Sequence, residues 1–129
     1  MLDSKIKVLV VDDAPLMRRV VTSLLRKIGV TEIQEAGSGA DALQILKQRK
    51  PDVVISDWSM PAMSGLELLQ AMRKDVSMNG VPFLLLTAKG EQSDIDEAKK
   101  AGVSGYLHKP FDVRLFEEEV KRVVQGRVR

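Results

Sequence analysis

The feature that most constrains the fold is a regular alternation between short apolar runs and longer segments with a helical period. The first run, residues 5–13 (KIKVLVVDD), is apolar and closes on two acids, a pattern typical of a strand buried on both faces of a parallel sheet. The period then changes, with Pro15 at the start of the next segment and Gly29 at its end. These signals predict an amphipathic helix, with apolar side chains at Met17, Val20, Val21, Leu24, Leu25 and Ile28.

The same alternation continues along the chain. Strands that alternate with helices of this length imply right-handed crossovers, so we predict a parallel sheet covered by helices on both faces. The carboxyl ends of all its strands then lie at one edge. We expect strands at residues 5–13, 32–36, 52–56, 81–87 and 104–108, and helices at residues 15–28, 39–49, 65–75, 92–102 and 113–126.

Length and composition exclude several classes of protein. A chain of 129 residues fits one domain, and its 44 % hydrophobic and 29 % charged residues exclude a disordered chain. The net charge of +2 is too small to indicate a nucleic-acid or membrane partner. Without cysteine, a signal peptide or a long apolar segment, the sequence predicts a cytoplasmic protein with no disulfide framework and no thiolate site.

Five polar side chains lie at the carboxyl ends of the predicted strands, the edge where ligands bind in open sheets of this kind. They are Asp12 and Asp13 at the end of the first strand, Asp57 at the end of the third, Thr87 at the end of the fourth and Lys109 after the fifth. Three carboxylates in one crevice repel one another unless cations are present, and oxygen ligands alone suit Mg²⁺. A carboxylate also attacks activated phosphorus when cations neutralise the transferring oxygens. The set therefore predicts a phosphoryl acceptor.

Four segments, taken together, resemble a known family. The chain carries, in this order, VLVVDD, DWSMPAMSGLELL, LLTA and GYLHKPF. They resemble the receiver domains of two-component response regulators, most of all the stand-alone chemotaxis regulators, over essentially the whole chain. The resemblance implies an α/β, flavodoxin-like fold, a doubly wound sheet of five parallel strands in the order 2-1-3-4-5 with five helices. It also implies a single receiver domain over residues 1–129 with no output domain.

The resemblance also implies roles for the residues at the sheet edge. Asp57 is the residue phosphorylated, Asp13 and Asp57 bind Mg²⁺ with the main-chain carbonyl of Ser59, and Asp12 acts through bound water. Thr87 donates a hydrogen bond to the phosphoryl group. Lys109 pairs with that group, and its peptide bond to Pro110 is cis.

A phosphoacceptor of this kind signals through protein contacts and is not an enzyme beyond its own phosphorylation and slow dephosphorylation. The weak apolar face of residues 92–102 predicts a mobile helix. On activation we expect Thr87 to move toward Asp57, Tyr106 to turn inward and this helix to shift. The resemblance suggests a CheA-like histidine kinase as donor, a flagellar motor switch protein as target and a monomeric state. The expected partner face comprises Ile95, Lys99, Tyr106, His108 and Glu119.

Two positions depart from the chemotaxis pattern. Ser59 and Lys89 lie two residues beyond Asp57 and Thr87, where the close chemotaxis relatives carry Asn and Glu. A short hydroxyl cannot reach as far to orient an attacking water, so we predict slow self-dephosphorylation. Lys99 and His108 also replace small or apolar residues expected on a motor-binding face.

Two other functions known for folds of this kind fit the sequence less well. A flavodoxin-like electron carrier needs small hydroxyl residues around a flavin phosphate, where this chain has DDAPLM. A haloacid-type phosphatase needs Asp-x-Asp after its first strand, whereas these acids are adjacent. A phosphorelay intermediate or phosphate sink with a non-flagellar target remains an alternative to motor control.

Overall fold

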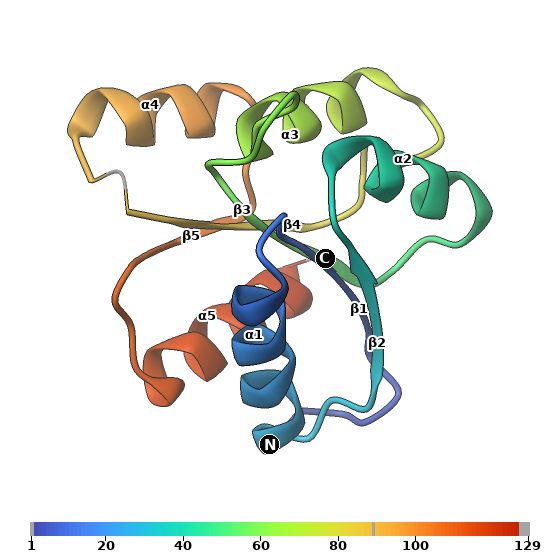
Figure 1. The fold of residues 1–129 in the computed structure, drawn as a ribbon, viewed down its shortest axis with the longest axis vertical. Coiled ribbons are helices and arrows are strands. Elements are labelled where there is room, and N and C mark those ends of the chain that lie inside the picture. Colours follow the sequence, from blue (N-terminus) through green and yellow to red (C-terminus); the bar gives the residue numbers. More distant parts are fainter. Residues whose placement is uncertain (1, 89, 127–129) are drawn as a thin grey trace.

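The computed structural model describes residues 2–88 and 90–126, in which five strands and five helices alternate along the chain (Figure 1). None of the described helices is both long and apolar enough to cross a membrane. The predicted order of elements is confirmed. The strands are β1 (Lys7–Val11), β2 (Glu32–Ala36), β3 (Val53–Asp57), β4 (Phe83–Thr87) and β5 (Gly105–His108), and the helices are α1 (Pro15–Lys27), α2 (Gly39–Gln48), α3 (Gly65–Lys74), α4 (Gln92–Lys100) and α5 (Val113–Gly126).

The five strands form one parallel sheet in the order β2-β1-β3-β4-β5. The predicted doubly wound, flavodoxin-like topology is therefore confirmed. The chain passes from β1 to β2 on one side and then returns to β3 on the other, so the strand order reverses between β1 and β3. Residues Val11 and Ser56 are register partners there, which places the ends of these two strands next to each other.

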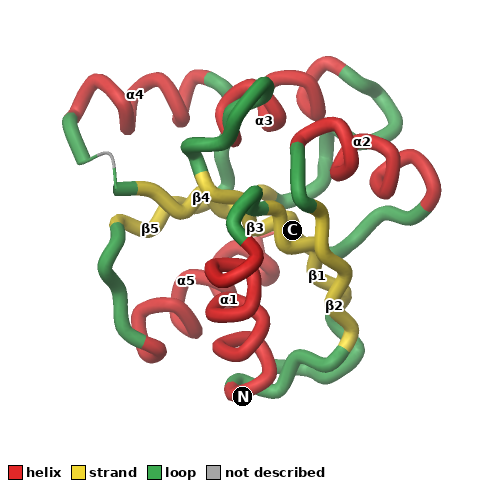
Figure 2. Tube along the Cα trace, viewed as in Figure 1, coloured by secondary structure: helices red, strands yellow, loops and turns green. Residues whose placement is uncertain are grey.

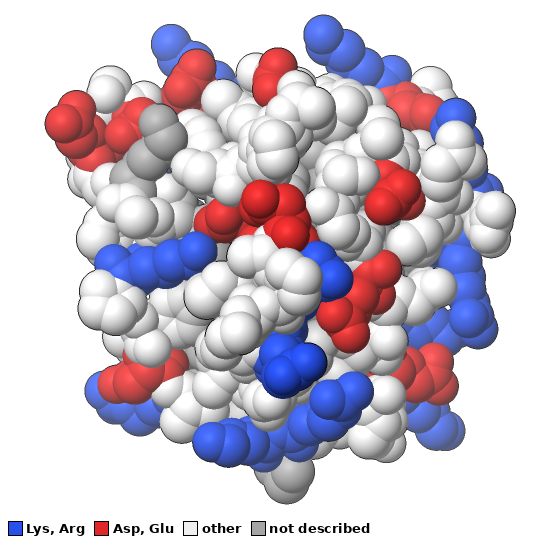
Figure 3. Space-filling model, in the orientation of Figure 1, with Lys and Arg blue, Asp and Glu red and all other residues white. Residues whose placement is uncertain are grey.

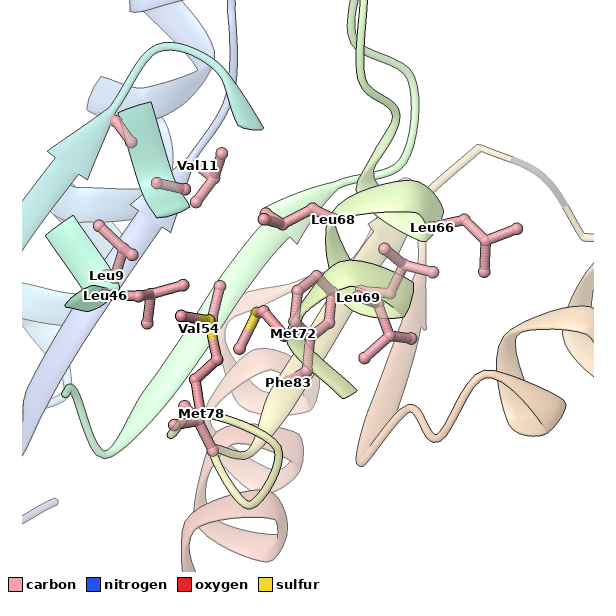
Figure 4. Packing of buried hydrophobic residues seen from close by; sticks show 14 of the residues in the cluster. Leu9, Val11, Leu46, Val54, Leu66, Leu68, Leu69, Met72, Met78 and Phe83 are labelled. Atoms are coloured by element: carbon pink, nitrogen blue, oxygen red, sulfur yellow. The ribbon is translucent and has the colours of Figure 1, made fainter. Parts of the chain in front are cut away.

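Helices cover both faces of the sheet: α2, α3 and α4 lie on one side, and α1 and α5 on the other (Figures 1 and 2). Each side has its own apolar cluster. The first joins Leu9, Val11 and Val54 to the inner faces of α2 and α3 (Figure 4). The second packs the opposite faces of the central strands against α1 and α5. Burial on both faces explains why the β1, β3 and β4 segments are continuously apolar.

Two details of the first strand and helix differ from the sequence-based expectation. The strand β1 ends at Val11, so Asp12 and Asp13 lie in the loop that follows it. Val20 was expected on the buried face of α1 but is 47 % exposed, because the buried stripe of this helix is formed by Val21, Thr22 and Leu25.

The helix α4 is the least anchored of the five, as its weak apolar face predicts. Its one buried residue is Ala98, and the N-cap residue Glu91 makes no side-chain capping hydrogen bond. The helix α3, by contrast, buries Leu68, Leu69 and Met72 among others and begins with a complete capping box. With little apolar burial, α4 is expected to move at a lower cost in free energy than the other helices.

Candidate functional site

Three carboxylates meet at the carboxyl edge of the sheet. Asp12 and Asp13 follow β1, Asp57 ends β3, and one oxygen from each lies within 4.8 Å of the others. The parallel register of β1 and β3 brings them together, although they are far apart in the sequence. Figure 3 shows acidic side chains gathered near the middle of the face in view, with basic side chains on either side. The structure thus assembles the acidic set that the sequence predicts.

The other two predicted site residues come from β4 and the segment after β5. The Lys109 Nζ donates a hydrogen bond to Asp57 Oδ1 at 2.8 Å. The main-chain nitrogen of Lys109 donates to the Thr87 carbonyl at 2.8 Å, which fixes the start of the loop. The Lys109-Pro110 peptide bond is cis, as the resemblance implies. Thr87 is buried at the end of β4, one residue beyond the register partner of Asp57.

The electrostatics of the site favour a bound cation. Burial raises the pKa of Asp12, since its side chain lies in the interior of the site, and the charges of Asp57 and Asp13 raise it further. The hydrogen bond that Asp12 Oδ1 accepts from the Ala14 N–H at 2.9 Å and the charge of Lys109 oppose this effect. One ammonium facing three carboxylates leaves the site negative. An oxygen-only, negative donor set of this kind fits a hard divalent cation such as Mg²⁺.

The backbone after β3 is tightly folded around Asp57. The Gly65 N–H donates to the Trp58 carbonyl at 2.7 Å, and Ser56 Oγ donates to the Asp57 carbonyl at 2.9 Å. A Cβ atom at Gly65 would overlap the Asp57 carbonyl oxygen, so this position accepts only glycine. The start of α3 therefore packs directly against the main chain of Asp57.

Sequence reasoning missed two residues that hold the loop after β1. The helical period puts Arg18 on the polar side of α1, yet its Nη1 donates to the Asp12 carbonyl at 2.7 Å. Its Nε donates to Glu35 Oε1, on β2, at 3.1 Å. The acceptor on Asp12 is a main-chain atom, so the sequence carries no signal for the first contact.

Of the two positions expected to tune dephosphorylation, the structure describes one. Ser59 is exposed and lines a shallow depression with Trp58 and Met60, next to the end of β3. Lys89 lies outside the described residues.

The expected partner face is only partly contiguous. Ile95, Lys99, Tyr106 and Glu119 line one depression of about 330 Å³ between α4, β5 and α5. His108 does not line it: its side chain is exposed and lies against Gly90. Glu119 is already engaged, because its carboxylate accepts hydrogen bonds from the Tyr106 N–H and from Arg122.

Comparisons with known proteins agree with this geometry. Residues 8–121 match the model of the response regulator receiver domain. The chain is 40 % identical over 124 residues to the chemotaxis protein CheY-3 of Vibrio cholerae, covering 96 % of this chain and 95 % of that protein. The solved structure of V. cholerae CheY4 is 35 % identical with a TM-score of 0.84, covering 92 % of this chain and 98 % of that one.

A further solved structure is similar to this chain and contains a metal. It is the receiver domain of the sensor histidine kinase PA1611 from Pseudomonas aeruginosa, with a magnesium ion coordinated in its active-site cleft. The two chains are 25 % identical with a TM-score of 0.82, and the match covers 92 % of this chain and 97 % of that one.

Proposed function

This chain belongs to the family of response regulator receiver domains and is CheY-like, and from that membership we propose that it accepts a phosphoryl group on Asp57. The observation that carries the proposal is the meeting of Asp12, Asp13 and Asp57 within 4.8 Å, with Lys109 bonded to Asp57. Family members of this kind are signalling proteins. The donor we propose is a CheA-like histidine kinase.

The chemistry follows from the residues at the site. A carboxylate oxygen of Asp57 attacks the phosphorus of a phosphohistidine, the P–N bond breaks, and the leaving imidazole nitrogen takes up a proton. Lys109 stabilises negative charge on the phosphoryl oxygens, and the Thr87 hydroxyl donates a hydrogen bond to one of them. Lys109 is close enough for this role, because its Nζ lies 2.8 Å from Asp57 Oδ1.

Asp13, Asp57 and the Ser59 carbonyl are the groups that we propose to hold Mg²⁺, with Asp12 acting through bound water. A Mg²⁺ ion bound there would supply positive charge against the transferring oxygens. The oxygen-only donor set supports this assignment. The magnesium ion in the PA1611 receiver domain supports it by analogy.

The test uses Trp58, which is buried next to Asp57, as a fluorescent reporter. We would add Mg²⁺ and then beryllofluoride, a stable stand-in for the phosphoryl group, to the parent, to Asp57→Ala and to the exposed-acid control Glu118→Ala. The parent and Glu118→Ala should respond saturably to both additions. Asp57→Ala should show no beryllofluoride step. A folded parent that responds to neither would overturn the proposal.

We further propose that phosphorylation acts on the depression between α4, β5 and α5. Thr87 ends β4, and its carbonyl accepts a hydrogen bond from the Lys109 N–H, so a shift of Thr87 is coupled to the end of β5. Tyr106 lies on that strand and lines the depression beside the weakly anchored α4. Hydrogen exchange in α4 and β5 should change when beryllofluoride binds. Unchanged exchange there would count against this switch.

The downstream target we propose is a flagellar motor switch protein, supported by the chemotaxis names of the similar proteins. A pulldown with an immobilised motor switch peptide should retain the parent only with Mg²⁺ and beryllofluoride present. Asp57→Ala should not be retained. If the immobilised peptide does not retain the activated parent either, the role of relay intermediate or phosphate sink is favoured instead.

We also propose that the phosphoryl group on Asp57 is long-lived, because Ser59 and Lys89 replace the Asn and Glu of the chemotaxis pattern. The double variant Ser59→Asn, Lys89→Glu should lose phosphate faster than the parent. Release of labelled phosphate from purified protein measures this. An equal or slower rate in the double variant would refute the explanation.

A further inference from the structure

We propose that Arg18 is a positioning residue for the magnesium site, acting through the main-chain carbonyl between the two adjacent acids. The inference rests on the proposed function, in which Asp13 and Asp57 bind Mg²⁺. Arg18 touches no carboxylate of the cluster in any contact of the described residues. It donates to the Asp12 carbonyl at 2.7 Å and to Glu35 Oε1 at 3.1 Å.

Asp12 is held at three points, two on its backbone and one on its side chain. Its N–H donates to the Ala36 carbonyl at 3.1 Å, which extends the pairing of β1 and β2 by one residue. Its Oδ1 accepts from the Ala14 N–H at 2.9 Å, which fixes the side chain. Its carbonyl is held by Arg18, whose side chain is itself 21 % exposed. A buried carbonyl needs a hydrogen-bond partner, since an unpaired one destabilises the fold.

The carbonyl held by Arg18 belongs to the peptide that joins Asp12 to Asp13. Rotation of that peptide plane changes ψ of the first residue and φ of the second, so both carboxylates would move. Mg²⁺ requires near-ideal octahedral geometry, and small ligand displacements weaken its binding. Glu35 completes the arrangement by holding the other side of the guanidinium from β2. Arg18 thus fixes the direction of two acids without contacting either carboxylate.

Charge and position predict opposite effects of removing this side chain. Arg18 carries the same sign of charge as the metal, so removing its charge alone should tighten Mg²⁺ binding. Removing its hold on the Asp12 carbonyl should weaken binding. Outer-shell partners of metal ligands commonly change metal affinity by about tenfold or more, which exceeds the effect of one exposed charge.

The experiment compares Arg18→Gln and Arg18→Met with Arg19→Gln, which removes the same charge from an exposed neighbour. Mg²⁺ is titrated against each protein, with Trp58 fluorescence and calorimetry as readouts. We expect both Arg18 variants to bind roughly tenfold more weakly than the parent. Arg19→Gln should bind as tightly as the parent or slightly more tightly. Parental or tighter binding in both Arg18 variants would overturn the inference.

A second readout needs no metal. Hydrogen exchange at the amides of Asp13 and Ala14 should be faster in the Arg18 variants than in the parent, while circular dichroism shows that α1 is retained. Unchanged exchange at both amides would also overturn the inference. If the parent itself does not bind Mg²⁺, the proposed function fails instead, so the two failures are distinguishable.

Discussion

At the scale of single residues, the loop between β3 and α3 carries backbone strain at Ala62. This residue has φ of +67°, which makes it the one non-glycine with positive φ among the described residues. The Met63 N–H donates to the Pro61 carbonyl at 2.7 Å across it, forming a three-residue turn. A turn of this kind with positive φ at its centre is the rare and strained form. The strained residue lies five positions after Asp57, in the loop that carries Ser59.

Ala62→Gly should therefore stabilise the protein, by about 0.5–1 kcal/mol. Glycine adopts positive φ without a Cβ penalty, and this gain exceeds the added freedom of the unfolded chain. Urea unfolding of the two proteins measures the difference. The control is Ala71→Gly, inside α3, which should cost about 1 kcal/mol. A loss of stability in both variants would show that Ala62 is not strained.

At the scale of elements, the edge strand β5 is held to α5 through Glu119. Its Oε2 accepts from the Tyr106 N–H at 3.0 Å, and Arg122 holds both carboxylate oxygens. Arg122 also donates to the Ser104 carbonyl at 3.2 Å. The hydrogen bond with Arg122 lowers the pKa of Glu119, and the bond from Tyr106 adds to this against the opposing effect of burial. These hydrogen bonds, which we call the Glu119 anchor, hold β5 to α5 within the expected partner face.

The Glu119 anchor predicts a specific pH dependence of the free energy of unfolding. A lowered folded-state pKa means that the unfolded chain binds the proton first, so stability is complete above about pH 4.3, the ordinary pKa of a glutamate, and is lost as pH falls below it. Glu119→Gln should be less stable than the parent at pH 7 by roughly 1 kcal/mol, and the gap should narrow in acid. Urea unfolding at a series of pH values tests this, with Glu118→Gln as the control. A constant gap from pH 7 to pH 3 would contradict it.

At the scale of the whole molecule, the candidate site lies at the edge of the sheet that separates the two apolar clusters. Its residues come from the ends of β1, β3, β4 and β5, which the clusters pack on opposite faces. Unfolding of either side would disperse the three acids, so a cation bound among them stabilises only the complete fold. Repulsion among these acids should make the protein without metal less stable than the protein with it.

Mg²⁺ at ten times its dissociation constant should therefore add about 1.4 kcal/mol to the free energy of unfolding. For a domain of this size that amounts to a rise in Tm of roughly 5 °C. Thermal unfolding with Mg²⁺ and with a chelator measures the shift. The shift should persist in Glu118→Ala and be reduced in Asp57→Ala. An equal shift in both variants would place the ion elsewhere.

The sequence by itself determined the elements and the edge of the sheet at which the acids would meet. The central strands read as apolar runs because both of their faces are buried, and the helices other than α4 show their buried sides through a 3.6-residue period. A parallel sheet places every strand's carboxyl end at one edge. Asp12, Asp13, Asp57, Thr87 and Lys109 could therefore be assigned to one site without any knowledge of distances.

Only the tertiary structure decided how that site is held. Arg18 reaches a main-chain carbonyl, and Glu119 accepts from a main-chain N–H. Every residue carries a main-chain carbonyl, and every residue except proline an N–H, so no sequence pattern marks the one that is used. The exposure of Val20 was also decided by the tertiary structure, since it depends on how α1 is rotated against the sheet. Periodicity fixes which side of an element is apolar, whereas contacts to the backbone depend on the distances and angles between packed elements.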